Sequence, residues 1–317
     1  MPAFYASGSA PQNRAYREKL EKATPNRLFS LHGSYRKGAS RWLTEIHEWR
    51  DTSDMGVMFD SGAFTAWSQG EEQPKVQDLL RIYCSALRYC EHKFKHVWFI
   101  SLDVIPGTKK SGSVTAEQVR DAIKQSDENH HILSAELGER VLPVFHQTEP
   151  LSRLDEVVAL NPTYICLSPR QGEGFVDKER RTWAMRVHSY LNGKVRTHGL
   201  ASTGGRMMTE IPWHSVDSAT WLLMASYGVI VFLDGHNIKP FFVSEHSGMK
   251  RMWKRHVDTA TDAVLKVVKW KCEQMGLSIK ELREVHEARC IYNMTILAEL
   301  AAVDTKPAPI PLTLFAP

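Results

Sequence analysis

Six predicted strands of this sequence end on residues that can transfer protons or hold polar groups. The residues at these ends are Asp60, Asp103, His146 with Gln147, Ser168, His198 with Gly199, and Asp217. Two carboxylates that face one substrate suit displacement at a sugar carbon, because one can attack while the other moves a proton. A glutamine amide both donates and accepts, which suits reading the edge of a purine-like base. These residue types predict base or sugar chemistry, provided that the fold brings the six ends together.

The first of these ends also has a simpler interpretation. In "FDSGAFTAW" (residues 59–67), Asp60 could cap the next helix while Ser61 and Gly62 form the turn. This stretch alone leaves both interpretations open. Three aspartates, a glutamine and two histidines at successive strand ends favour a shared site over coincidence.

The elements that must position these residues alternate between strand and helix. Strands are expected at 56–60, 96–103, 140–147, 163–169, 194–202 and 213–223, with a further candidate at 229–235. Helices are expected at 75–90, at 151–160, at 178–191 and from about residue 113, where Thr115 and Gln118 fit a capping box. Repeated strand–helix units of this length predict a parallel sheet.

A closed barrel fits this alternation better than an open sheet. No Gly-x-Gly-x-x-Gly loop follows any strand, and the middle of the chain shows no domain break. We therefore expect an α/β fold, a single (β/α)8 TIM barrel domain over 1–317, with a C-terminal helical segment at 258–302 and a proline-rich tail at 303–317. In such a barrel all six strand ends meet at one rim.

The composition of the chain indicates which partners and which cell compartment are compatible with this site. The chain has 317 residues, a net charge of +4 and a pI near 8.7, which permits a polyanionic partner without requiring one. Five scattered cysteines predict reduced thiols and a cytoplasmic protein. The N-terminal residues 1–14 are polar and rich in Pro, Gly and Ser, without a signal-peptide core, and no apolar run is long enough to span a membrane.

Several common catalytic motifs are missing from the sequence. It has no His-x-His pair at a strand end and no His-Glu-x-x-His, so a catalytic metal has little support. It also lacks a Gly-x-Ser-x-Gly elbow and a Walker A loop. We therefore expect neither a metal nor an organic cofactor.

The ordered set of strand-end motifs resembles the tRNA-guanine transglycosylase superfamily. The motifs that carry the resemblance are "FDSGAF" (59–64), "SLDVIPG" (101–107), "LPVFHQ" (142–147), "THGLAS" (197–202) and "HSVDSATW" (214–221). They are similar, in the family's order, to its Asp-Ser-Gly-Gly-Phe segment, its second base-recognition aspartate, its base-recognising glutamine strand, its Gly-Gly-Leu-Ala loop and its nucleophile strand. Each motif alone is weak, but the ordered set is fairly specific.

The resemblance implies a covalent base-exchange reaction and a role for each motif. Asp217 would attack C1′ of the target nucleoside and expel guanine, and an incoming 7-deazaguanine would then attack the same carbon. Asp60 would be the general acid and base, at the floor of a base pocket with Ser61 and Gly62. The residues expected to hold the base are Asp103, His146 and Gln147 at its edge, Phe64 on its face, and the backbone of Gly199, Leu200 and Ala201.

Departures from the family pattern point to DNA rather than tRNA. The structural zinc motif, Cys-x-Cys-x-x-Cys with a distant His, is absent, and only Cys272, Cys290 and His286 stand near its place, where core burial is the favoured interpretation. The arginines that follow the nucleophile in the tRNA enzymes are replaced by "ATWLLMAS" (219–226), and no added RNA-binding domain is expected. The chain thus resembles the branch from phages and bacterial modification clusters that exchanges guanine in DNA for preQ0 or a derivative.

Basic residues after two strands are candidates for contacts with DNA phosphates. Lys109, Lys110 and Arg170 would orient a strand whose target base is flipped out or presented single-stranded. A homodimer is compatible with the sequence. The alternatives are a tRNA-guanine transglycosylase and a catalytically silent nucleic-acid-binding barrel, although a silent site would need neither Asp60 nor Asp217. A metal-dependent barrel hydrolase lacks the required ligand spacing.

Overall fold

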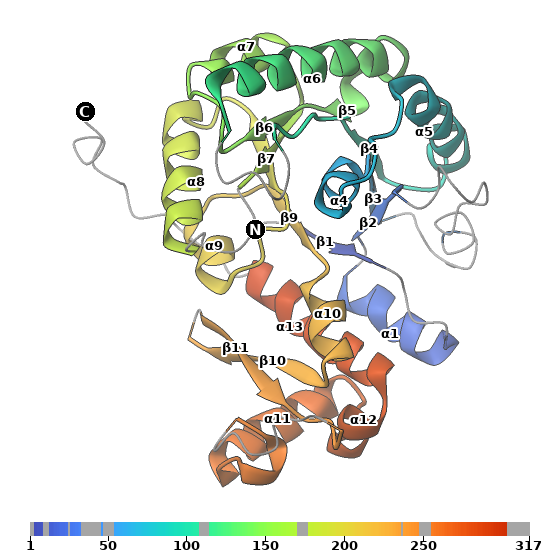
Figure 1. Cartoon of the computed structure of the whole chain (residues 1–317). Helices are drawn as coiled ribbons and strands as arrows, with labels where there is room; N and C mark the ends of the chain where they lie inside the picture. Colours follow the sequence, from blue (N-terminus) through green and yellow to red (C-terminus); the bar gives the residue numbers. More distant parts are fainter. Residues whose placement is uncertain are drawn as a thin grey trace.

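The fold is a parallel sheet wrapped by helices (Figure 1). The computed structural model describes residues 3–8, 13–24, 26–32, 46, 54–107, 114–169, 177–235, 237–246 and 255–302. The strands of the main sheet are β1 (Ala3–Ser7), β2 (Asn26–Ser30), β3 (Gly56–Asp60), β4 (His96–Ile100), β5 (Val141–Leu142), β6 (Val144–His146), β7 (Tyr164–Ser168), β8 (Arg196–Gly199) and β9 (Ser215–Ser218). Each pairs in parallel with its neighbours, in the order β5-β4-β3-β2-β1-β9-β8-β7-β6.

The two ends of this strand order belong to one extended segment, which closes the sheet. β5 pairs with β4 and β6 pairs with β7, and only Pro143 separates β5 from β6. Proline has no backbone N–H to give to a ladder, but the carbonyl of Pro143 accepts from Cys166 N at 2.9 Å. Residues 141–146 therefore act as one strand that pairs with β4 on one side and with β7 on the other. The expected (β/α)8 barrel is confirmed.

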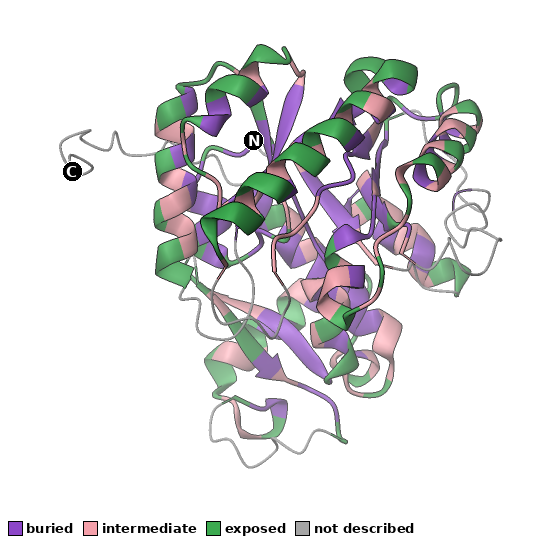
Figure 2. Ribbon diagram, turned by 45° about the horizontal axis from the view of Figure 1, so that its top comes forward, coloured by how far each residue is buried: buried purple, intermediate pink, exposed green. Residues whose placement is uncertain are grey.

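Helices cover the outside of the barrel. They are α1 (Arg14–Ala23), α4 (Ala63–Gln69), α5 (Val76–Cys90), α6 (Ala116–Leu137), α7 (Arg153–Ala159), α8 (Asp177–Leu191), α9 (Gly205–Glu210) and α10 (Thr220–Ser226), with a 3-10 turn at Gly138–Arg140. The predicted capping box starts α6, since Gln118 N donates to Thr115 Oγ1 at 3.2 Å and Thr115 N donates to Gln118 Oε1 at 2.9 Å. Figure 2 shows that buried residues concentrate on the strands while the helices expose their outer faces.

After α10 the chain leaves the barrel and then returns to it. An antiparallel pair, β10 (Val229–Asp234) and β11 (Asn237–Phe242), is followed by a 3-10 turn (Val257–Thr259) and by α11 (Asp262–Gln274), α12 (Ile279–Glu284) and α13 (His286–Ala301). α13 packs against α1, α10 and β1, whereas β10, β11, α11 and α12 lie below the barrel in Figure 1. The expected C-terminal helices are thus confirmed, and residues 303–317 lie outside the described part.

Two strands of the barrel come from a part of the chain where the sequence predicted none. β1 lies in the stretch that we interpreted only as a polar N-terminal segment, and β2 follows it at 26–30. The candidate strand at 229–235 exists as β10 but pairs with β11 outside the barrel. β1 pairs with both β2 and β9, so the two N-terminal strands complete the closed barrel.

The interior of the barrel has an apolar lower layer and a polar upper layer. One buried cluster fills the interior: Tyr5, Leu28, Met58, Ile100, Leu142, Tyr164 and Cys166. Because alternate residues of a strand face the same side, the positions two residues further along point inward as well. Asp60 follows Met58 in this way, and Asp217 pairs in register with Tyr5. The apolar layer closes the barrel beneath the strand ends that carry the carboxylates.

Candidate functional site

Asp60 ends β3 in a turn that the backbone holds rigidly. Its Oδ2 accepts the Gly62 amide at 3.2 Å, and the Ser30 hydroxyl of the neighbouring strand also donates to the carboxylate. Gly62 has φ of 81°, and a Cβ there would lie 2.8 Å from the backbone of His32. Only glycine fits this position, so the Asp-Ser-Gly turn fixes where the Asp60 carboxylate points. Ser61 is buried, and its Oγ accepts the Ala63 amide at 3.3 Å at the start of α4.

The carboxylates at the rim act on one another electrostatically. Burial, together with the negative charges of Asp103 and Asp217, raises the pKa of Asp60 to about 7. Burial and the same three aspartates also raise the pKa of the Cys166 thiol well above its usual value. β3, the segment after β4, and β9 therefore bring Asp60, Asp103 and Asp217 into one site, as the barrel predicts.

Asp103 pairs with a histidine from the neighbouring strand segment, β6. His146 Nε2 lies 2.9 Å from Asp103 Oδ2, and both side chains are only 11% exposed. Burial alone would lower the pKa of His146, but hydrogen bonding and the charges of Asp103 and Glu149 outweigh it and raise the pKa. The pair can therefore present an imidazolium donor beside a carboxylate acceptor.

Asp217 is held from below by groups of β8 and β9. Its Oδ1 accepts the Ala201 amide at 2.9 Å and lies 3.3 Å from Nε2 of the fully buried His198. On the other side of its ring, His198 Nδ1 lies 2.6 Å from Ser215 Oγ, which also contacts the Tyr164 hydroxyl. The carboxylate thus has a fixed orientation at the mouth of the barrel.

The loop after β8 uses part of its backbone for these contacts. Leu200 N donates to Leu167 O at 3.0 Å, while Ala201, with φ of 48°, gives its amide to Asp217. A Cβ on Gly199 would lie 2.8 Å from the Ser202 Cβ, so the loop needs glycine there. The amides of Leu200 and Ala201 are thus committed within the protein, and the loop supports Asp217 directly.

Gln147 and Phe64 lie at the edges of the site. Gln147 follows the inward-facing His146 and lines a cavity of about 480 Å³ together with Lys178, Trp183 and other residues of α8. This places Gln147 on the α8 side of the strand end, above the stacked rings of Phe145 and Trp183. Phe64 is 42% exposed on α4, with its ring centroid 5.9 Å from that of Trp67. Phe64 is open to solvent, so its ring is available to a ligand.

Some residues expected at the site cannot be placed. Lys109, Lys110 and Arg170 lie outside the described residues. Ser168, the remaining strand-end residue, closes β7 opposite His146 in the register of the sheet.

The C-terminal cysteines lie in the core. Cys272 and Cys290 are 1% exposed, and burial raises the pKa of each thiol to about 12. His286 lies 3.7 Å from Cys290 Sγ and 3.2 Å from Ser226 Oγ. Among the described residues, no group of three His, Cys, Asp or Glu side chains is arranged to hold a metal ion.

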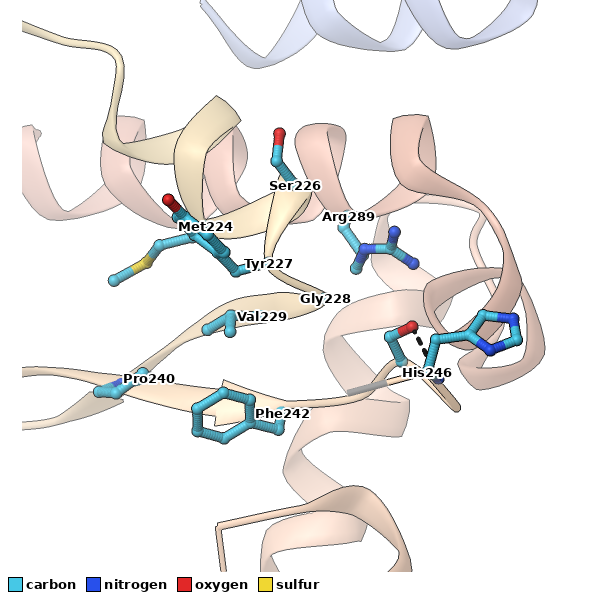
Figure 3. Close-up of a pocket in the computed structure, with 10 residues that line it drawn as sticks. Met224, Ser226, Tyr227, Gly228, Val229, Pro240, Phe242, His246 and Arg289 are labelled. Carbon is cyan, nitrogen blue, oxygen red and sulfur yellow. Dashed lines mark hydrogen bonds between the residues drawn. The ribbon is translucent and has the colours of Figure 1, made fainter. Parts of the chain in front are cut away.

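A second cavity lies away from the rim, between α10, the β10–β11 pair and α13 (Figure 3). It measures about 540 Å³, and Val229, Pro240 and Phe242 form much of its wall. Arg289 borders it, but its guanidinium donates to Ala225 O and to Leu282 O, both at 2.9 Å. These bonds cap the last turns of α10 and α12, which gives Arg289 a structural role.

Sequence reasoning missed four residues of the site: Ser30, Tyr164, Cys166 and Ser215. Strand alternation could have indicated two of them, since Cys166 stands two residues before Ser168 and Ser215 two before Asp217. Ser30 was missed because β2 itself was not predicted, and Tyr164 because nothing in the sequence shows that it faces Ser215.

Comparisons with known proteins give little beyond this geometry. No family model and no curated protein matches the chain. One matching solved structure is N-(5′-phosphoribosyl)anthranilate isomerase from Pyrococcus furiosus, with 13% identity, coverage of 69% of this chain and 88% of that chain, and a TM-score of 0.37. The assignment of the barrel rests on the strand pairing described above. No helix in the described part of the chain is long and apolar enough to cross a bilayer.

Proposed function

We propose that this protein is a DNA-guanine transglycosylase, which exchanges guanine in DNA for a 7-deazaguanine such as preQ0 or a derivative. One observation carries the proposal: three aspartates converge at one barrel mouth, and the pKa of one of them, Asp60, is raised to about 7. An acid that is half protonated near neutral pH can both give and take a proton in one catalytic cycle. Asp217, whose Oδ1 accepts the Ala201 amide and lies 3.3 Å from His198 Nε2, is the carboxylate best placed to attack.

In the first half of the reaction, Asp217 Oδ2 attacks C1′ of the target nucleotide. The C1′–N9 bond breaks, and its electron pair leaves with guanine. Asp60 in its acid form gives its proton to the departing base, while a glycosyl ester forms on Asp217.

In the second half, the replacement base reverses these events. Asp60, now a carboxylate, takes the N9 proton of the 7-deazaguanine, and N9 attacks C1′. The ester bond to Asp217 breaks, which restores both aspartates. Two inversions at C1′ retain its configuration.

Asp103 and His146 are the groups that hydrogen-bond to the edge of the base. A carboxylate can accept from the N–H donors of guanine, and an imidazolium can donate to its carbonyl. Their 2.9 Å contact and their burial keep the carboxylate acceptor and the imidazole donor ordered at the rim. The same two groups serve guanine and a 7-deazaguanine, because these bases share that edge.

The choice of DNA over tRNA rests on the sequence. The "ATWLLMAS" segment (219–226) takes the place of the tRNA-contacting arginines, and the zinc motif is missing. Within the described residues, α10 fills that segment and packs against α13. A tRNA enzyme with the same chemistry is the competing proposal.

The experiment is exchange of radiolabelled guanine into single-stranded DNA, duplex DNA and tRNA by the purified protein. We expect label in DNA, chased by added preQ0. The matched control is Asp234→Asn, which removes an exposed aspartate on β10 that pairs with Lys239. Label in tRNA but never in DNA would transfer the assignment to the tRNA enzyme, and label in neither would contradict the proposal.

A further inference from the structure

A buried chain of polar contacts, two hydrogen bonds and one ion-pair contact, leads from the barrel interior to Asp217. We propose that His198 is a positioning residue that donates Nε2–H to Asp217 Oδ1 and so holds the nucleophile, with its tautomer set by Ser215 and Tyr164. The inference rests on the proposed function, because it assigns how the attacking carboxylate of that reaction is aimed.

The distances define an ordered chain. The Tyr164 hydroxyl contacts Ser215 Oγ, Ser215 Oγ lies 2.6 Å from His198 Nδ1, and His198 Nε2 lies 3.3 Å from Asp217 Oδ1. Ser215 and Asp217 are two residues apart on β9, so both face the barrel interior. β8 supplies His198 and β7 supplies Tyr164, which makes the chain a product of barrel closure.

One direction of donation gives every group of this chain a compatible partner. Burial raises the pKa of Tyr164, so its hydroxyl keeps its proton and can donate to Ser215 Oγ. Ser215 then donates to His198 Nδ1, and the ring proton sits on Nε2, toward Asp217. The reverse direction would put a ring lone pair against the Asp217 carboxylate, which is unfavourable.

The surroundings of His198 prevent it from contacting a substrate directly. The ring is fully buried, and Tyr5 and Tyr164 meet it edge-on with centroids 5.8 and 6.3 Å away. Asp217 is the one charged group at hydrogen-bonding distance from the ring among the described residues. His198 therefore does not reach the base, and its effect on the reaction passes through Asp217.

The contacts of Asp217 leave its other carboxylate oxygen for attack. Ala201 N donates to Oδ1 at 2.9 Å and His198 Nε2 lies 3.3 Å from the same atom, so both groups restrain Oδ1 and we assign the attack to Oδ2. Fixing a reacting atom in this way raises the rate because less freedom is lost at the transition state. A misplaced nucleophile should therefore slow the chemistry more than it weakens binding.

Two substitutions of His198 separate the contact at Nε2 from the contact at Nδ1. In His198→Gln the amide nitrogen can still reach Asp217, whereas in His198→Asn the shorter side chain keeps only the contact to Ser215. We expect His198→Asn to lower kcat about 100-fold with little change in KM, the cost of a small misplacement of reacting groups. His198→Gln should recover most of that loss.

A control is available on α8, which packs against the outer side of β8. His188 of α8 is half-buried, with Nε2 2.8 Å from Thr197 Oγ1 and Nδ1 2.8 Å from Ala184 O. His188→Asn should lower the melting temperature as much as His198→Asn while kcat stays unchanged. An unchanged kcat in folded His198→Asn would overturn the inference.

A second measurement does not depend on turnover. ¹⁵N NMR of histidine-labelled protein without substrate should show His198 with its proton on Nε2 and an unprotonated Nδ1. A proton on Nδ1 would overturn the inference even if guanine exchange is observed. The expected tautomer in a protein without exchange activity would support the hydrogen-bond chain and remove the proposed function instead.

Discussion

The rim carries two aspartate–histidine pairs that differ in what surrounds them. Asp103 and His146 lie 2.9 Å apart at the mouth of the barrel, each 11% exposed. Asp217 and His198 lie 3.3 Å apart, with His198 at 0% exposure beneath the rim. The charged groups that act on His146 are the carboxylates of Asp103 and Glu149, whereas His198 has Ser215 on one ring nitrogen and Asp217 near the other.

This difference shows how the same two residue types can serve opposite purposes. The pKa of His146 is raised because its two acidic neighbours outweigh burial, so the Asp103–His146 pair, which we call the open pair because it lies at the barrel mouth, favours a charged imidazole more than a free histidine does. The buried pair instead has its tautomer fixed by a hydroxyl and cannot reach a ligand. We therefore expect changes in the open pair to alter binding, and changes in the buried pair to alter rate.

The largest effect should come from the aspartate of the buried pair. Asp217→Asn leaves an amide that cannot form the glycosyl ester, so guanine exchange should fall by about 10⁴–10⁶-fold, the scale seen when a nucleophile is removed. Binding of free base, measured by calorimetry, should be nearly unchanged. Asp234→Asn should exchange at the wild-type rate, and substantial exchange by Asp217→Asn would remove it as nucleophile.

Asp60, between the two pairs, should show the next effect. Asp60→Asn removes the group that moves the proton, so exchange should fall about 10²–10⁴-fold. In the wild type, the first half-reaction should slow as pH rises through about 7, because Asp60 loses its proton. Single-turnover rates of base release between pH 5.5 and 8.5 would check this, and a rate independent of pH would contradict it.

The same substitution should change stability in a pH-dependent way. Because folding raises the pKa of Asp60 from 3.8 to about 7, ionising it costs the wild type stability between these two pH values. Asp60→Asn avoids this cost, so its melting temperature should exceed that of the wild type by a few degrees at pH 8 and by less at pH 5. An equal difference at both pH values would show that Asp60 has an ordinary pKa.

The open pair should affect affinity more than rate. His146→Gln cannot carry charge, so KM for the incoming base should rise about 10–100-fold, the value of one hydrogen bond to a charged group. In an Asp60→Asn background, base affinity should fall as pH rises through the raised pKa of His146. The His146→Gln version of that protein should show a flat profile, and loss of kcat without a change in KM would reverse the roles of the two pairs.

The smallest effect is expected at the neighbour of His146. Gln147 lies toward α8, so Gln147→Ala should change KM less than about threefold, as expected for a position outside the hydrogen-bonded core of a site. A KM change as large as that of His146→Gln would show that Gln147 turns inward when the base binds.

The alternation of strands and helices was enough to predict the barrel from the sequence, and the residues at the strand ends were enough to predict its polar rim. The run before Asp60 is short and apolar, and both Asp60 and Asp217 stand at positions that the barrel turns inward. β1 escaped notice because its five residues lie among Gly, Ser and Pro, where local composition indicates a loop. β10 reads like a barrel strand, and only its antiparallel partner reveals otherwise.

The pairing of side chains within the site could not be read from sequence. His198 and Asp217 stand on neighbouring strands, but their contact depends on the register of β8 against β9, which no local pattern fixes. His146 rather than Gln147 is the inward residue because it follows Leu142 and Val144 of the interior cluster at two-residue steps, but the sequence alone did not show which phase of this strand faces the interior. The sequence therefore predicted part of the rim, its aspartates and histidines, and the three-dimensional closure decided which of these side chains touch.

Covalent capture of the intermediate tests the central claim most directly. The wild-type protein is mixed with single-stranded DNA in the absence of free base, quenched in denaturant, and digested for mass spectrometry. The account predicts a protein–DNA adduct on the peptide that contains Asp217, lost in Asp217→Asn and released when 7-deazaguanine is added. An adduct on Asp60 or Asp103, or exchange into DNA with no adduct at any time point, would contradict it.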